Sequence, residues 1–294
     1  MTSKHKEKLI IGAVKVDTVN KPHKSRVKNN NPARCENVVW AFIRKAIAVT
    51  ELEARKLWHD PTDIISRSFQ PLIWLLLFGQ VLAQTHLVVI KNMSYLEYIT
   101  PGILAQSVLF VAIFHGLSVI WERDLGIIQK LLVAPVPRIA IVLGKAWMAG
   151  IRGLSQIIVI YLIALLIQVQ LNHSISSIIG VLIITMISAG IFSTFSLIIA
   201  CIVKTRERFM GIGQVLTMPL FFASNAIYPI NIMPAWLKIV ANMNPLSYEV
   251  DALRILMLKT DSTFYGLSID IVLLSLTLLL LLMIAARLYP RLAN

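Results

Sequence analysis

The feature that most constrains this chain is the length of its uncharged apolar stretches. Residues 153–203 contain no Asp, Glu, Lys or Arg, and shorter stretches of the same kind lie before and after them. A helix needs about 20 predominantly apolar residues to cross the roughly 30 Å hydrocarbon core of a bilayer. Several stretches reach that length, so the sequence favours a membrane protein with several spans over a large soluble helical protein.

The composition agrees with this assignment. Of the 294 residues, 57% are hydrophobic and 15% are charged, whereas a soluble domain carries about 25% charged residues. The sequence predicts an all-α membrane protein with six transmembrane helices. The expected spans are residues 64–84, 99–121, 139–169, 176–203, 210–223 and 269–288.

The residues before the first span divide into two parts. Residues 1–35 are polar and rich in Lys and Asn, which is typical of a disordered tail. Residues 36–60 place Trp40, Ile47 and Trp58 near one face at helical spacing, which predicts an interfacial helix on the membrane surface. We therefore expect a disordered cytoplasmic tail over 1–35 and a transmembrane domain over 36–290.

The basic residues are distributed asymmetrically along the chain. The net charge is +13, and with six spans and a cytoplasmic N-terminus 22 of the 28 Lys and Arg fall in cytoplasmic segments. Basic residues beside spans are retained on the cytoplasmic side, so both termini are expected there and the charge reflects topology rather than nucleic-acid binding. The two cysteines, Cys35 and Cys201, lie too far apart to indicate a disulfide framework or a metal site.

The segment before the last span, residues 225–254, is moderately apolar but interrupted by proline. Pro229, Pro234 and Pro245 would each break a helix. Broken apolar pieces at membrane depth are tolerated where protein buries them or where they line a cavity. The segment therefore predicts two short re-entrant helices on the extracytoplasmic side, with an ordinary extracellular loop as the alternative.

A charged stretch, VIWERDLGIIQKLLVAPVPR over residues 119–138, separates the second span from the third. Leu125, Ile128 and Leu132 are spaced three and four apart and predict one apolar stripe on a short cytoplasmic helix, which Pro135 and Pro137 end. So short a helix is not stable alone in water, so its stripe needs a partner. The membrane surface, helices of the same chain and another protein are the possible partners.

The stretch WERDLGIIQKLLVAP resembles the cytoplasmic loop of type-2 ABC exporter permeases, the integral membrane subunits related to nodulation-factor and daunorubicin exporters. That loop follows roughly the pattern E-R-x-x-G-T-x-E-x-L-x-x-x-P. The chain departs from it at Ile127, where Thr is usual, and at Gln129, where Glu is usual. The matching residues, which the resemblance implies couple the chain to an ATPase, are Glu122, Arg123, Gly126, Leu131 and Pro135.

The extracytoplasmic segment is similar to a second pattern of the same family, P…P-x-W…N-P-x-x-Y…R. Its matching residues are Pro229, Pro234, Trp236, Asn244, Pro245, Tyr248 and Arg254. The resemblance extends over about residues 38–288, and it also fits the length of the chain, the six spans and the interfacial helix.

The resemblance implies a permease subunit of an ATP-driven exporter in a bacterial or archaeal plasma membrane. The 122–138 helix would be the coupling helix that docks on a separate ABC ATPase subunit. A second permease subunit would complete a homo- or heterodimer among membrane lipids, and a drug, lipid or lipid-linked glycan would pass between the two. The chain contains no G-x-x-x-x-G-K-[ST] phosphate loop, so we expect the partner to hydrolyse ATP and this chain to bind no cofactor or metal.

Two other functions are open, a secondary ion-coupled transporter and a non-transporting membrane scaffold. Ion-coupled transporters usually place acids or histidines within their spans. Here the spans contain His115, with Asp270 at an edge, while Arg67 and Arg152 lie near cytoplasmic ends where they snorkel. An intramembrane enzyme is disfavoured because the sequence has neither H-E-x-x-H nor G-x-S-x-G.

Overall fold

The computed structural model describes residues 51, 69, 71, 73–81, 94–133, 136–203, 205–258 and 264–293. The described residues all belong to one structural unit, residues 37–294. The predicted tail, the interfacial helix apart from residue 51, and part of the first span lie outside the described residues, as does Pro135.

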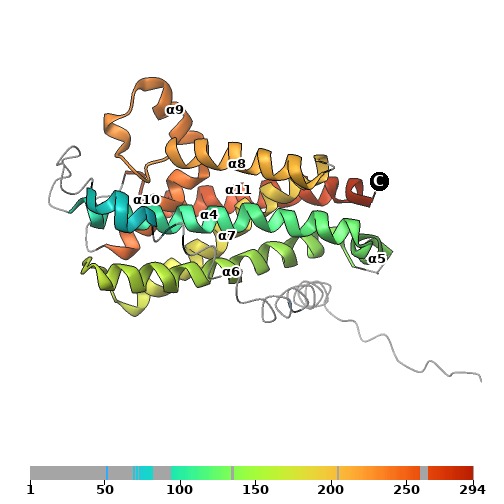
Figure 1. Ribbon diagram of the computed structural model, residues 1–294, viewed down its shortest axis with the longest axis horizontal. Helices are drawn as coiled ribbons and strands as arrows, with labels where there is room; N and C mark the ends of the chain where they lie inside the picture. Colours follow the sequence, from blue (N-terminus) through green and yellow to red (C-terminus); the bar gives the residue numbers. More distant parts are fainter. Residues whose placement is uncertain are drawn as a thin grey trace, which may run out of the picture. The chain divides into compact units, whose positions relative to one another are not determined.

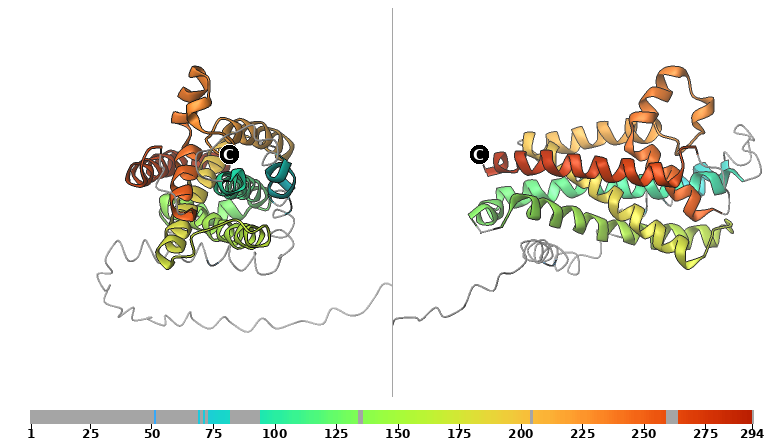
Figure 2. Two further views of the ribbon diagram at one scale, coloured as in Figure 1. Left: turned by 90° about the vertical axis from the view of Figure 1, so that its left-hand side faces the viewer. Right: turned by 180° about the vertical axis from the view of Figure 1, so that it is seen from behind.

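The described part of the chain is helical and contains no β-strand. α4, α6, α8 and α11 run lengthwise side by side, and α7 crosses them obliquely (Figure 1, Figure 2). The elements are η1 (Trp74–Gly79, π-helical), α4 (Tyr95–Asp124), α5 (Ile127–Val133), α6 (Arg138–Leu166), α7 (Ile175–Ile202), α8 (Arg206–Phe222), η2 (Ile230–Ile232), α9 (Ala235–Met243), α10 (Pro245–Met257), α11 (Leu267–Leu288) and η3 (Tyr289–Ala293).

Four of the predicted spans are confirmed as helices that are long and apolar enough to cross a membrane. They are α4, α6, α7 and α11 continued by η3. α8 corresponds to the predicted fifth span, but its 17 residues reach only about 25 Å, which is short of a roughly 30 Å core. The first predicted span is described only in part, around η1. The count of six spans therefore stays a prediction.

α4 is the central helix of the described bundle. It packs on α6, α7, α8 and α10 and is buried along most of its length. Two of its hydroxyl groups donate hydrogen bonds to backbone carbonyls one turn earlier, Thr100 to Leu96 at 2.6 Å and Ser107 to Ile103 at 2.7 Å. Such back-bonding lets hydroxyl groups lie between packed helices without a lost hydrogen bond.

The segment before the last span, residues 225–254, forms two short helices of unlike burial. Pro229 precedes η2, Pro234 precedes α9, and Pro245 is the first residue of α10, so the prolines delimit the helices as predicted. α10 packs among α4, α7 and α11, whereas α9 leaves Trp236 67% exposed. The two short helices are thus confirmed, and their re-entrance into a membrane stays a prediction.

Gly102 lets the chain before η2 lie directly against α4. A Cβ atom at this position would be 2.5 Å from the carbonyl oxygen of Ala226 and 2.9 Å from its Cα. One turn earlier, Tyr98 donates its hydroxyl to the carbonyl of Asn225 at 3.1 Å. The same face of α4 therefore holds the extracytoplasmic segment by a close approach and by a hydrogen bond.

Gly102→Ala is expected to lower the stability of the protein because the backbone at Ala226 must move, which costs roughly 1–3 kcal/mol in a well-packed site. Gly211→Ala on α8 is the matched control, since nothing lies within 4 Å of its added Cβ. There the better helix propensity of alanine should raise stability by about 0.5–1 kcal/mol. Thermal unfolding of both variants in detergent checks this, and shifts of the same sign would contradict the close approach.

Candidate functional site

The residues that the sequence places in a coupling loop form an elbow between α4 and α5, defined here as residues 121–133. α4 ends at Asp124, and Gly126 then adopts a φ of +69°, in the left-handed region that glycine favours. A Cβ atom at Gly126 would meet only Gln129 Oε1, at 3.9 Å. The glycine is therefore required by the backbone turn and not by crowding from the other described residues.

α5 rests on the end of the bundle through one apolar face. Ile128 is fully buried in a cluster with Val119, Ile141 and Tyr289, and Leu131 and Leu132 pack against the same cluster. The stripe predicted from the sequence is correct for Ile128 and Leu132 and wrong for Leu125, which is 68% exposed. The reason is the turn at Gly126, which starts the helix only at Ile127.

The opposite face of α5 is exposed. Gln129 and Val133 lie four residues apart on this side, and Val133 is 88% exposed; Leu125, in the turn before α5, is exposed as well. Lys130 is exposed as well. The elbow therefore exposes two large apolar side chains, Leu125 and Val133, beside polar ones, while the opposite face of α5 packs on the bundle.

Glu122 lies inside the protein and holds the end of α4 against α6. Lys145 Nζ donates to Glu122 Oε2 at 2.6 Å, and the two side chains are only 2% and 6% exposed. Removing one partner of such a pair leaves a charge buried without its counterion, which typically costs about 3–5 kcal/mol. The sequence pointed to Glu122 as a residue of the coupling loop, and the structure gives it an intramolecular contact.

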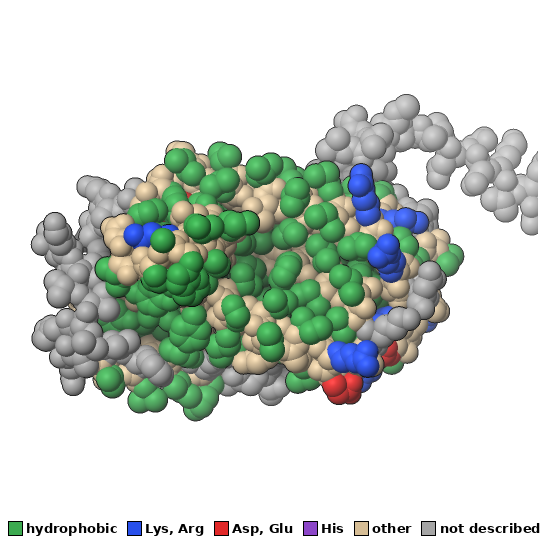
Figure 3. Space-filling model, turned by 90° about the horizontal axis from the view of Figure 1, so that it is seen from above, with side chains coloured by type: hydrophobic (Ala, Val, Ile, Leu, Met, Phe, Trp, Pro, Cys, Tyr) green, Lys and Arg blue, Asp and Glu red, His purple; other side chains and the backbone are tan. Residues whose placement is uncertain are grey.

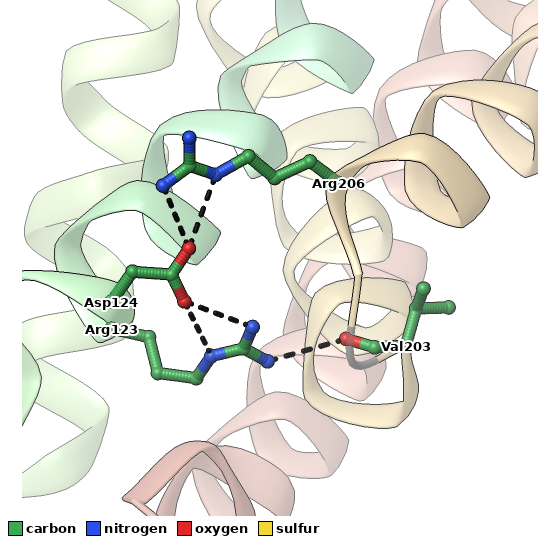
Figure 4. A network of polar contacts seen from close by, with 4 residues as sticks. All are labelled: Arg123, Asp124, Val203 and Arg206. Carbon is green, nitrogen blue, oxygen red and sulfur yellow. Dashed lines mark hydrogen bonds and ion pairs between the residues drawn. The ribbon is translucent and has the colours of Figure 1, made fainter.

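Arg123 and Asp124 belong to a polar network on the surface of the elbow (Figure 4). Arg206, the first residue of α8, donates to Asp124 Oδ2 from Nε at 3.1 Å and from Nη2 at 2.8 Å. Arg123 donates to Asp124 Oδ1 at 3.3 and 3.1 Å and to the carbonyl of Val203 at 3.5 Å. Arg206 also lies 4.0 Å from the ring centroid of Trp121. The network joins α4, the end of α7 and the start of α8.

The ends of the helices bring further basic residues to the end of the bundle where the elbow lies. Figure 3 shows Lys and Arg side chains gathered at one end of one face, with hydrophobic side chains over much of the rest. The basic residues at the elbow and at these helix ends are Arg123, Lys130, Arg138, Arg206, Arg208, Arg287 and Arg291. This gathering is what the asymmetric charge distribution in the sequence predicts for a cytoplasmic end.

At the extracytoplasmic segment, Asn244 connects the start of α10 to the end of α8. Its side-chain oxygen accepts from Leu246 N at 3.0 Å, as an N-cap does. Its amide nitrogen donates to the carbonyls of Leu220 at 2.7 Å and Ala223 at 3.4 Å. These carbonyls lie where α8 ends and lack helical partners, so one side chain satisfies two helix ends.

Arg254 makes a second connection in the same region. Its Nη2 donates to the carbonyl of Asn225 at 2.9 Å, and its guanidinium lies 3.9 Å from the centroid of the Tyr98 ring. Tyr248 donates its hydroxyl to the carbonyl of Asn242. The structure thus brings Asn244 and Arg254 of the predicted motif into buried contacts, whereas Trp236 faces outward on α9.

Sequence reasoning missed several of these residues. Lys145 lies inside the predicted third span and received no role there, although a lysine within a span signals a buried partner. Three buried acids at the extracytoplasmic end, Glu249, Asp251 and Asp270, were also missed as a group. Asp251 accepts from the backbone N–H groups of Phe264 at 3.1 Å and Tyr265 at 3.0 Å, a contact that spacing alone does not reveal.

The architecture and the comparisons agree on the class of protein. The chain is a multi-pass membrane protein by its apolar helices. Residues 44–258 match the family model described as ABC-2 type transporter, and the chain belongs to that family.

Several curated proteins are similar to the chain. The ycf38 protein of Cyanophora paradoxa, named as a transport permease, is 32% identical over 218 residues, which cover 73% of this chain and 74% of that protein. The ycf38 protein of Porphyra purpurea is 29% identical and covers 76% and 78%. The daunorubicin resistance ABC transporter permease protein DrrB1 of Streptomyces coeruleorubidus is 23% identical and covers 68% and 70%.

Glu122→Ala is expected to destabilise the protein by about 3–5 kcal/mol because the buried ammonium group of Lys145 then loses the carboxylate to which it donates at 2.6 Å. The double variant Glu122→Leu and Lys145→Met removes both charges and should recover most of that loss. Lys130→Ala, at an exposed position on α5, is the control and should leave stability unchanged. Thermal unfolding in detergent measures all three, and a Glu122→Ala variant as stable as wild type would refute the pairing.

Proposed function

We propose that the chain is the transmembrane permease subunit of an ATP-driven exporter and that the exposed face of α5 is the docking surface for a separate ABC ATPase subunit. The observation that carries the proposal is the packing of α5: one face is buried against the bundle, and the other is exposed at the basic end. Membership of the ABC-2 type transporter family supports it.

The geometry separates residues that would contact the ATPase from residues that position α5. Leu125 and Val133 expose apolar area on an aqueous end of the protein, where such area typically marks an interaction site. Gly126 makes the turn and Leu131 helps to seat the helix. Glu122, through Lys145, fixes the helix that α5 follows. On this proposal most of the family pattern supports α5 from behind, and the partner contacts Leu125, Gln129 and Val133.

The remaining parts of the proposal concern assembly and cargo. Two permease subunits would associate, with an ATPase below each, and a hydrophobic or amphipathic substrate would leave the cytoplasm between them along the first, second and fifth spans. The name of DrrB1 links that relative to resistance to the drug daunorubicin. A drug, a lipid or a lipid-linked glycan therefore stays our proposal for this chain, as does a bacterial or archaeal plasma membrane.

Ion-coupled transport is the second candidate because Glu249 and Asp270 are fully buried and, within the part of the chain that the structure describes, their carboxyl oxygens accept no hydrogen bond. Acids in such a setting are the groups that proton-linked transporters use. Transport in sealed vesicles separates the two functions. Export that needs ATP and persists without an ion gradient supports the first proposal.

Val133→Asp is expected to abolish co-purification of the ATPase from detergent because a carboxylate replaces an apolar side chain at the docking surface. Membrane insertion should stay normal, since Val133 is 88% exposed and does not belong to the apolar cluster around Ile128 on which α5 packs. Ile232→Asp, 64% exposed in η2 at the extracytoplasmic segment, is the matched control and should keep the ATPase. Retention of the ATPase by Val133→Asp would exclude this face of α5.

The orientation has a separate test by cysteine labelling in intact cells. With Cys35 and Cys201 replaced by serine, Gln129→Cys should be protected from a membrane-impermeant maleimide because it lies at the basic end. Met243→Cys, at a position that is 80% exposed on α9, should react. Labelling of Gln129→Cys before cell lysis would show that the orientation is the opposite of the one proposed. α5 would then lie outside the cell, where a cytoplasmic ATPase cannot bind it.

A further inference from the structure

α8 is attached to the bundle differently from the other long helices. It packs on α4 and only slightly on α7, and it lies along one edge of the bundle (Figure 1). Val215 is 70% exposed and Phe222 is 42% exposed on its outward side. Inward contacts are made by side chains such as Phe209 and Phe221, which are fully buried. Among the described elements, α8 therefore rests mainly on α4, with Trp74 of η1 packed against Phe221 and Phe222 near its end.

Two polar connections hold the two ends of α8. At the basic end Arg206 binds Asp124 through two nitrogens, at 2.8 and 3.1 Å, and covers the Trp121 ring. At the other end the Asn244 amide holds the carbonyl of Leu220 at 2.7 Å. The first connection leads to the elbow, and the second leads to α10.

The middle of α8 lies against α4 with little interlocking. A Cβ atom at Gly213 would meet Ile113 at 3.5 Å, which is ordinary van der Waals contact. The Thr217 hydroxyl donates within α8, to the carbonyl of Gly213 at 2.6 Å, and so not to α4. α8 is one continuous helix of 17 residues, about 25 Å long, and its one internal proline, Pro219, lies in the last turn, so a displacement of one end of α8 reaches the other end.

We infer that Asp124, Arg206 and Asn244 are positioning residues that make α8 the connection between the elbow and the extracytoplasmic helices. A movement that an ATPase imposes on α5 shifts Asp124, Arg206 carries the shift into α8, and Asn244 carries it to α10. This inference rests on the proposed function, since it needs an ATPase at the elbow. It adds which residues transmit the movement and by which helix.

The exposure of the first connection separates positioning from stability. Asp124 and Arg206 are 36% and 38% exposed, and exposed ion pairs contribute about 0–1 kcal/mol. Their loss should therefore leave the fold and ATP hydrolysis intact while it disconnects α8. A residue that served only the fold would change stability and would not change how α8 responds to ATP.

The test uses the complex with its co-purified ATPase in lipid nanodiscs, with Cys35 and Cys201 replaced by serine. Phe222→Cys reports on the end of α8 through its rate of reaction with a maleimide, measured without nucleotide and with ATP and vanadate. We expect nucleotide to change this rate in the background, and the change to be lost in Asp124→Arg and in Asn244→Ala. The double variant Asp124→Arg and Arg206→Asp should restore it.

Arg208→Ala is the matched control, because Arg208 is an exposed residue of the first turn of α8 and forms no hydrogen bond or ion pair with the residues that the structure describes. It should behave as the background does. Asp124→Asn gives a milder variant if Asp124→Arg lowers the yield. A background without any nucleotide response refutes the proposed function, whereas a responsive background together with a responsive Asp124→Arg variant overturns the inference about α8.

Discussion

The buried ion pair between Glu122 and Lys145 is the interaction on which the basic end of the protein depends. Both charges lie away from water, and each stabilises the other there. The pair fixes the end of α4 against α6. Asp124, the turn at Gly126 and the seat of α5 all follow within eleven residues of Glu122 along the chain.

The sequence predicted the long helices well because the signal for a span is robust. An apolar stretch of some 20 residues without a charge is best accommodated as a helix that spans the membrane. α4, α6, α7 and α11 all lie where they were expected. It predicted the elbow less well. Helical spacing assigned Leu125 to the buried stripe, but the positive φ of Gly126 starts α5 later and turns Leu125 outward. Periodicity cannot detect a change of backbone direction within the window that it averages.

The charged positions show why motif reasoning stops short of geometry. Glu122 matched a family pattern, which says that a charge is needed and not which way it points. Its partner Lys145 lies 23 residues away on another helix. The prolines did predict the short helices after α8, because their effect on the backbone is local. The burial of α10 was not predictable from the same residues: Glu249, Asp251 and Arg254 suit a solvated surface by composition, and tertiary packing encloses them.

The two ion pairs of the elbow differ in burial, and they therefore differ in how strongly they hold their helices together. Glu122–Lys145 is enclosed, so separating α4 from α6 exposes two charges to a poor environment. Asp124–Arg206 is partly exposed, so water replaces either partner with little change in free energy. α4 and α6 therefore move as one body, whereas α8 keeps its place against the end of α4 through a contact that water can replace. On the proposed function, a movement of α5 carries the end of α4 with it, and Asp124 passes that movement to Arg206 at the start of α8. α8 then responds to the ATPase only while this contact is made.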